Sequence, residues 1–144
     1  MPSANRGIRC WSTHCTVATL MGFRSHREFA AWRFAYELRR ALIPLLRKLL
    51  HAHDYGLHKN MQEAARTPPR NIAEGFGRFK HRDFARFVRI AKASEVELLD
   101  HLLEAHTSGY IDAKELAELE HLTKKAIKAA TGLIRYLENT PDVD

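Results

Sequence analysis

The chain has 144 residues, which is long enough for one domain with an ordinary hydrophobic core. Hydrophobic residues make up 45% and charged residues 28%, with only 7 glycines and 5 prolines, which excludes collagen-like, low-complexity and disordered proteins. No apolar run approaches the roughly 18 residues that a membrane-spanning helix needs. Two cysteines are too few for a disulfide scaffold, so we expect a folded protein of the reducing cytoplasm.

The charge is distributed unevenly along the chain. Residues 1–92 contain 18 Lys/Arg and 6 Asp/Glu, whereas residues 93–144 contain 5 and 11. A basic half and an acidic half predict two surfaces with different partners. Nucleic acid is one candidate partner for the basic half, and pairing of the two halves between copies of the chain is the other.

Residues 1–22 have neither helical nor strand periodicity, so they are predicted to be an irregular N-terminal extension of a domain that covers 23–140. Their apolar stretch is interrupted by Thr16, Thr19 and Gly22, which argues against a secretion signal. Met21 directly precedes the periodic part, and a domain that begins there is the alternative.

The first helix is predicted after Ser25 and Glu28, whose spacing is that of a capping box. Two apolar rows follow along this helix, more than one bundle seam requires, which favours self-association. One row is Phe29, Trp32, Tyr36, Ile43, Leu46 and Leu50, and the other is Ala35, Leu38, Leu42, Leu45 and Leu49. Pro44 predicts a kink, because the apolar rows continue on both sides of it.

A second helix is predicted from about Leu57 to Glu74. The consecutive Pro68 and Pro69 remove two amide donors inside it, so we expect a kink or a short break. The sequence Gly75-Phe76-Gly77 would end the helix with residues that tolerate positive φ.

The third helix is predicted over about 81–107 and the fourth after a second capping box, formed by Asp112 and Glu115. The third helix has one apolar face, which contains Phe84, Phe87, Ala91, Leu98 and Leu102. The fourth has another, with Leu116, Leu119, Leu122, Ala126, Ala130, Leu133 and Leu137. Four amphipathic helices with short connections predict an all-α, antiparallel, up-and-down four-helix bundle.

The sequence offers no catalytic or metal-binding constellation. A di-iron bundle needs two Glu-x-x-His pairs, but there is one, Glu118 and His121, and His121 points away from the apolar face. The group Cys10, His14 and Cys15 is weak evidence for zinc. We therefore predict solvated histidines, no metal, no cofactor and no enzymatic activity.

A basic segment over residues 78–92 remains as the candidate functional feature. The candidate nucleic-acid-binding residues are Arg78, Lys80, Arg82, Arg86, Arg89 and Lys92. Arg82, Arg86 and Arg89 recur at helical spacing and form one stripe opposite the apolar face, where guanidinium groups can track phosphates. The alternative is a solvated face whose arginines pair with Glu74 or with the acidic half of a neighbouring subunit. Phe76 and Phe79 could stack on bases, although core packing is the preferred interpretation.

Two stretches carry a resemblance to a known family. They are Asn71-Ile72-Ala73-Glu74-Gly75-Phe76-Gly77-Arg78 and Phe84-x-x-Phe87-x-x-Ile90-Ala91-x-x-Ser94-x-x-Glu97-Leu98. They resemble the bacterial four-helix bundle proteins encoded by intervening sequences of the 23S ribosomal RNA gene. The accessory variability proteins of diversity-generating retroelements are similar. The resemblance extends more loosely over 25–138, through Tyr55-Gly56-Leu57 and Gly109-Tyr110-Ile111.

The resemblance implies a ring-like homopentamer with a basic channel or surface that contacts nucleic acid, and no established enzymatic activity. It also implies a structural motif of Asn71, Glu74, Gly75, Ser94 and Glu97. Four matched polar residues are expected to satisfy backbone groups freed by Pro68 and Pro69: Asn71, Glu74, Arg78 and Glu97. In a retroelement, the partners would be a reverse transcriptase and its RNA.

The chain departs from the family at two places. Residues 62–69 lack the usual arginine pair before Ser-Ile-Pro, and Ala93-Ser94 replaces Gly-Ser. The sequence thus predicts an RNA-binding accessory protein or, as the alternative, an interaction module whose basic and acidic surfaces pair across subunits.

Overall fold

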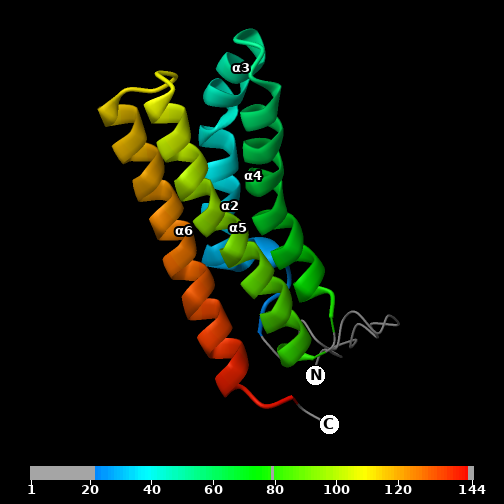
Figure 1. The fold of residues 1–144 in the computed structure, drawn as a ribbon. Helices are drawn as coiled ribbons and strands as arrows, with labels where there is room; N and C mark the ends of the chain where they lie inside the picture. The colour runs from blue at the N-terminus through cyan, green and yellow to red at the C-terminus, as the bar shows by residue number, and fades with distance from the viewer. Residues whose placement is uncertain (1–21, 79, 143–144) are drawn as a thin grey trace, which may run out of the picture.

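The computed structural model describes residues 22–78 and 80–142; the predictions for residues 1–21, including the extension and both cysteines, and for Phe79 lie outside these ranges. The described elements are η1 (His26–Glu28), α2 (Ala30–Ala41), α3 (Ile43–His51), α4 (Tyr55–Phe76), α5 (His81–Thr107) and α6 (Ala113–Asn139). The α2–α3 unit, α4, α5 and α6 run alternately up and down side by side (Figure 1). The predicted all-α four-helix bundle is confirmed.

The first predicted helix is divided into α2 and α3 at Leu42, whose φ of −79° and ψ of −13° remain nearly helical. The Leu42 amide still donates to the Leu38 carbonyl at 3.1 Å, and the Leu46 amide donates to Leu42 at 2.9 Å. Pro44 has no amide hydrogen for the carbonyl of Arg40. The helix is therefore interrupted for a single residue next to Pro44, and no loop separates α2 from α3.

The capping box predicted at Ser25 is wrong. The Ser25 hydroxyl accepts from the Arg27 amide at 3.2 Å, and the Glu28 carboxylate accepts from the Arg24 amide at 3.0 Å. These bonds stabilise the 3-10 turn η1, and α2 begins only at Ala30. The second capping box is confirmed, since Asp112 and Glu115 exchange bonds of 2.8 and 2.9 Å at the start of α6.

Of the kink or short break predicted in the second helix, the break is wrong, because α4 is continuous through Pro68 and Pro69. Two prolines remove the donors for the carbonyls of Ala64 and Ala65 only, and the fixed φ of proline suits a helix. Both proline rings are buried, so their packing offsets the lost hydrogen bonds.

The core consists of two clusters along the bundle axis. The aliphatic cluster lies toward the α3–α4 turn and the α5–α6 loop; its larger members are Leu38, Leu42, Leu45, Leu49, Leu57, Met61, Leu98 and Leu102. The aromatic cluster lies toward η1 and the α4–α5 junction; its larger members are Phe29, Ile72, Phe84, Val88, Leu133 and Leu137. All five residues predicted for the apolar face of the third helix are buried.

A polar clasp joins the α3–α4 turn to the α5–α6 loop at one end of the bundle (Figure 1). The Tyr110 hydroxyl donates to Asp54 Oδ2 at 3.0 Å, and the Lys48 ammonium donates to the Tyr110 carbonyl at 2.7 Å. Asp54 Oδ1 accepts from the Leu57 amide and so caps α4. The hydrogen bond to Asp54 raises the pKa of Tyr110, with burial and the carboxylate charge adding to it. Asp54 therefore links the two loop motifs of the resemblance, since it binds both the Tyr110 hydroxyl and the Leu57 amide.

None of the helices in the described ranges is both long enough and apolar enough to cross a membrane.

Candidate nucleic-acid interface

The predicted basic residues gather where α4 ends and α5 begins. Arg78 follows α4, Lys80 is the residue that precedes the first turn of α5, and Arg82 and Arg86 lie exposed on its first turns. We call Arg78, Lys80, Arg82 and Arg86 the basic corner. The positive end of the α5 dipole adds to their charge, which favours anions at this place.

The basic corner contains both paired and unpaired cations. Arg78 forms a 2.9 Å ion pair with Glu74, as the alternative interpretation predicted, and its guanidinium stacks 4.8 Å from the Phe87 ring centre. The guanidinium of Arg86 lies 5.6 Å from the same ring centre. Within the described residues, Lys80, Arg82 and Arg86 have no carboxylate partner.

The third stripe arginine, Arg89, is in a different situation. It forms an ion pair with Glu138 of α6, and both side chains remain about half exposed. The two also line a hollow beside the first turn of α5, together with Asp142. The Asp142 carboxylate accepts from the His81 amide at 2.6 Å. An anionic oxygen therefore already binds the N-terminus of α5, next to the basic corner.

Gly75 belongs to the structural motif because α4 and α5 approach each other closely there. A Cβ at Gly75 would lie 2.5 Å from Phe84 Cδ2 and 2.9 Å from Phe87 Cβ. The prediction that Gly75-Phe76-Gly77 ends the helix is confirmed, since α4 ends at Phe76, and Gly77 caps it with a φ of −75° and so does not use positive φ. Phe76 packs against Phe84 in the aromatic cluster, as its preferred interpretation predicted.

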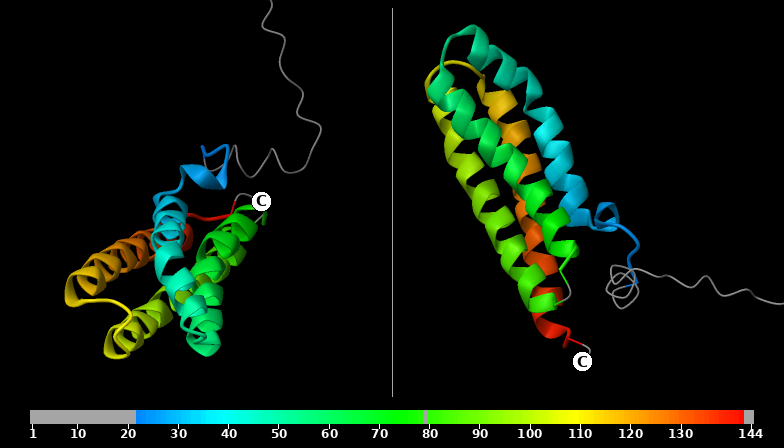
Figure 2. Two further views of the ribbon diagram at one scale, coloured as in Figure 1. Left: turned by 90° about the horizontal axis from the view of Figure 1, so that it is seen from above. Right: turned by 90° about the vertical axis from the view of Figure 1, so that its right-hand side faces the viewer.

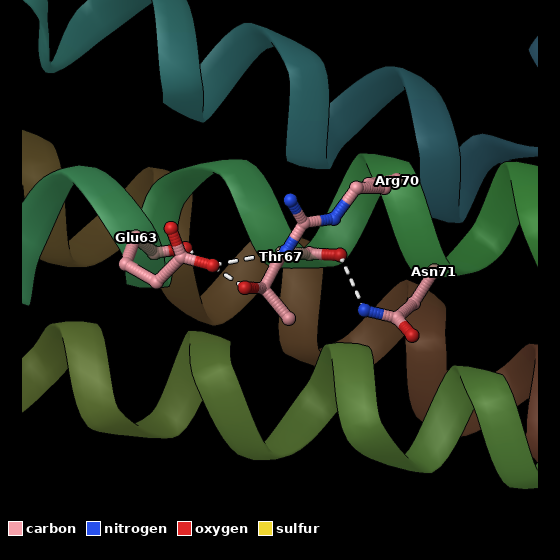
Figure 3. A network of polar contacts seen from close by, with 4 residues as sticks. All are labelled: Glu63, Thr67, Arg70 and Asn71. Atoms are coloured by element: carbon pink, nitrogen blue, oxygen red, sulfur yellow. Dashed lines mark hydrogen bonds and ion pairs between the residues drawn. The ribbon is translucent and has the colours of Figure 1, made fainter.

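The polar members of the motif do not repair the backbone at the prolines. The side-chain amide of Asn71 donates to the Thr67 carbonyl at 2.9 Å, while the Thr67 hydroxyl donates to the Glu63 carbonyl (Figure 3). Glu63 also pairs with Arg70 across the same helix surface. The carbonyls freed by the prolines are those of Ala64 and Ala65, so the expected role of Asn71 is wrong.

Two other motif members, Glu74 and Glu97, each bind a residue four positions further along the chain. Glu74 pairs with Arg78 at the surface, as predicted for an arginine partner. Glu97 Oε1 forms a 3.0 Å hydrogen bond with His101 Nε2, one turn further along α5. Ser94 is half-buried on α5.

A family model described as 23S rRNA-intervening sequence protein matches residues 27–132, from η1 through most of α6. The chain belongs to this family. Among curated proteins, no sequence matches it. The matched range contains the whole basic corner and all five residues of the structural motif.

Lys92 and Glu95 lie beside each other on α5 of this family member. Lys92, one of the candidate nucleic-acid-binding residues, is half-buried there, in contrast to the exposed Arg82, Arg86 and Arg89. Glu95 is fully buried, and neither carboxylate oxygen has a hydrogen-bond partner among the described residues. Burial raises the pKa of Glu95 to about 8, against an opposing effect of Lys92. The signal was present in the sequence, because Glu95 continues the helical spacing of Ala91 and Leu98.

The prediction of solvated histidines is wrong for two positions on α5. His81 and His101 are each 8% exposed, and the Nδ1 atom of each is buried without a hydrogen bond. His121 is exposed, as predicted. In the described part of the chain, no cluster of His, Cys, Asp and Glu has the arrangement of a metal site.

A second basic surface of the family member was missed. Arg33, Arg40 and Arg47 recur every seven residues on the exposed side of α2 and α3. They alternate with the exposed apolar residues Tyr36, Ile43 and Leu50. The seven-residue spacing of the arginines was visible in the sequence. It was overlooked because Tyr36, Ile43 and Leu50 on the same face had been assigned to an apolar row.

Proposed function

We propose that this member of the 23S rRNA-intervening sequence family is a non-catalytic RNA-binding accessory protein that contacts the phosphate backbone with its basic corner. The observation that carries the proposal is the group Lys80, Arg82 and Arg86. These three exposed cations stand at the positive end of α5 and have no carboxylate partner within residues 22–78 and 80–142. Unpaired surface cations can bind phosphates without first breaking an ion pair within the protein.

Binding of this kind depends on charge rather than on base sequence. Lysine and arginine contacts to phosphate release counterions, so affinity falls steeply with added salt. The contacts position the protein on the strand and read no bases. We therefore expect similar affinities for unrelated single-stranded RNA sequences of equal length.

The test removes Lys80, Arg82 and Arg86 together by substitution with Gln. Each lost contact lowers the slope of log affinity against log salt by about 0.7 on single strands, so the triple variant should lose about 2. The matched control replaces Lys114, Lys124 and Lys128 of α6 by Gln, which removes the same charge far from the corner. Fluorescence anisotropy with labelled RNA at several salt concentrations measures both. An unchanged slope in the corner variant, or an equal loss in the control, contradicts the proposal.

The second candidate function is self-assembly, favoured by the outer apolar row of the first helical unit. Tyr36, Ile43 and Leu50 are 41%, 41% and 45% exposed, although the neighbouring row is buried. We propose that this row contacts another copy, in the ring-like pentamer that the resemblance implies. Light scattering should then report a multiple of 16.6 kDa, and Ile43→Lys should lower that mass. A monomer at micromolar concentration contradicts this candidate.

A further inference from the structure

Within residues 22–78 and 80–142, no other element covers the outward face of α5. The helix packs between α4 and α6, on the side of the bundle opposite α2 and α3 (Figure 2). Exposed residues recur on it with the alternating three- and four-residue spacing of a helix that meets another helix. The centre of this face is marked by Arg86, Ala93 and Asp100, each seven residues apart.

The charges on this face change sign at its midpoint. The exposed residues Arg82, Arg86 and Arg89 precede Ala93, and the exposed residues Glu97, Asp100 and Glu104 follow it. The distances from Ala93 match on the two sides. Arg89 and Glu97 lie four residues away, Arg86 and Asp100 seven, and Arg82 and Glu104 eleven.

We propose that this face binds a second copy of the chain, with the two α5 helices antiparallel about a two-fold axis at Ala93. In that register each arginine lies beside an acid of the other copy: Arg82 beside Glu104, Arg86 beside Asp100, and Arg89 beside Glu97. The two-fold axis forms each pair twice, because an isologous contact uses the same surface on both copies. The paired segments extend over about 33 Å.

The apolar residues of the face agree with the same register. Ile90 and Val96 are 44% and 50% exposed, and each lies beside the other across the axis. Ala93 on the axis is small, which lets the two helices come close. In this register, Asp83 of one copy lies beside Leu103 of the other copy and opposite no acidic residue.

The alternative orientation is disfavoured by charge. Parallel helices in register would place arginine on arginine in one half and acid on acid in the other. Arg89 keeps its exposed ion pair with Glu138 in the antiparallel arrangement and gains Glu97 of the second copy as an additional partner.

This pairing goes beyond RNA binding and competes with it. The second copy would cover Arg82 and Arg86 of the basic corner, so RNA and the second copy exclude each other on this face. Self-association and RNA binding can be tested separately through the acidic half of α5, because a substitution at Asp100 leaves all cations of the basic corner in place.

A charge swap tests the pairing by sedimentation equilibrium at low salt. Arg86→Asp and Asp100→Arg should each weaken self-association on this face by about tenfold or more, since each creates two like-charge contacts. The double variant restores both pairs and should recover the wild-type value. Arg66→Asp on α4, with the same charge change on another surface, should leave association unchanged. Failure of the double variant to recover overturns the proposal, whatever the RNA affinity of Asp100→Arg turns out to be.

Disulfide cross-linking tests the register in a chain whose Cys10 and Cys15 are replaced by Ser. Ala93→Cys lies on the proposed axis and should form a covalent dimer on mild oxidation. Thr107→Cys lies on the same face, but its two copies would be about 42 Å apart in the antiparallel pair and would meet only in a parallel one. Cross-linking at Thr107→Cys, or none at Ala93→Cys, overturns the proposal.

Discussion

The two ends of the bundle hold their core together differently. Near the α4–α5 junction, the rings of Phe29 and Phe84 pack edge to face with their centres 5.6 Å apart, and Phe76 lies at the same distance from Phe29. Near the α3–α4 turn, the core is aliphatic and is closed by the clasp between Tyr110 and Asp54. At the aromatic end the Phe84 ring lies directly against the backbone of α4 at Gly75, where a Cβ would overlap it.

Between the two ends, the middle of the bundle contains residues that neither cluster includes. On α5, Glu95 separates Ala91 of the aromatic cluster from Leu98 of the aliphatic cluster. On α4, Pro68 and Pro69 occupy the corresponding interval. The two ends of the bundle are therefore filled by apolar side chains, while the middle contains an ionisable group that lowers stability when charged.

The largest expected effect is the pH dependence that Glu95 gives to stability. The pKa of Glu95 is about 8 in the folded protein and near 4.5 when unfolded, so the folded state keeps a proton that the unfolded state releases. The unfolding free energy should therefore fall as pH rises from about 4.5 to about 8, by about 5 kcal/mol in total, and then level off. Glu95→Gln should abolish this fall, as measured by urea unfolding at pH 5 and pH 8.

The control for Glu95→Gln is Glu104→Gln, an exposed change on the same helix. It should retain the wild-type fall in stability between pH 5 and pH 8. If Glu95→Gln retains that fall as well, the buried carboxyl is not its source.

The next effect concerns the close approach at the aromatic end. Gly75→Val should destabilise the protein by about 3 kcal/mol, because its Cβ alone would overlap the Phe84 ring and the Phe87 Cβ. Gly132→Val is the matched control, since a Cβ on that α6 glycine meets nothing within 4 Å. Thermal unfolding of both variants measures the difference. Equal melting temperatures would show that α4 and α5 can separate without penalty.

A smaller effect is expected at the clasp of the aliphatic end. Asp54→Ala removes the cap of α4 and should cost about 1 kcal/mol. Asp54→Asn keeps an acceptor for the Leu57 amide, so it should cost less, but it removes the carboxylate charge. Both changes should bring the raised pKa of Tyr110 back toward its ordinary value, as measured by ultraviolet titration with Tyr110→Phe as the reference. An unchanged titration would mean that the hydroxyl does not bind Asp54 in solution.

The smallest effect is a gain in stability away from both clusters. Gly132→Ala should stabilise the protein by about 0.5–1 kcal/mol, because alanine is the better helix former and the site is open. The same substitution at Gly75 should not give this gain. The pair of alanine variants, compared by urea unfolding, separates intrinsic helix propensity from the close contact at the aromatic end.

Sequence periodicity was sufficient for the elements whose formation is local. The predicted bounds of α5 match the observed His81–Thr107, and the capping box at Asp112 begins α6. The stripe of Arg82, Arg86 and Arg89 is exposed as predicted, because helical spacing places these residues on one side. The box at Ser25 failed because a 3-10 turn offered the same groups other nearby partners.

Contacts between helices decided what the sequence alone left open. Arg89 is paired because Glu138, distant in the sequence, lies beside it on α6, while Arg82 and Arg86 have no carboxylate partner among the described residues. Gly75 is needed because the Phe84 ring comes from another helix. The alternation of residues along the chain thus determined the helices, their apolar faces and the positions of the charges. The burial of Glu95, its raised pKa and the pairing of Arg89 with Glu138 were decided only by the tertiary structure, because each depends on atoms that other helices bring into contact.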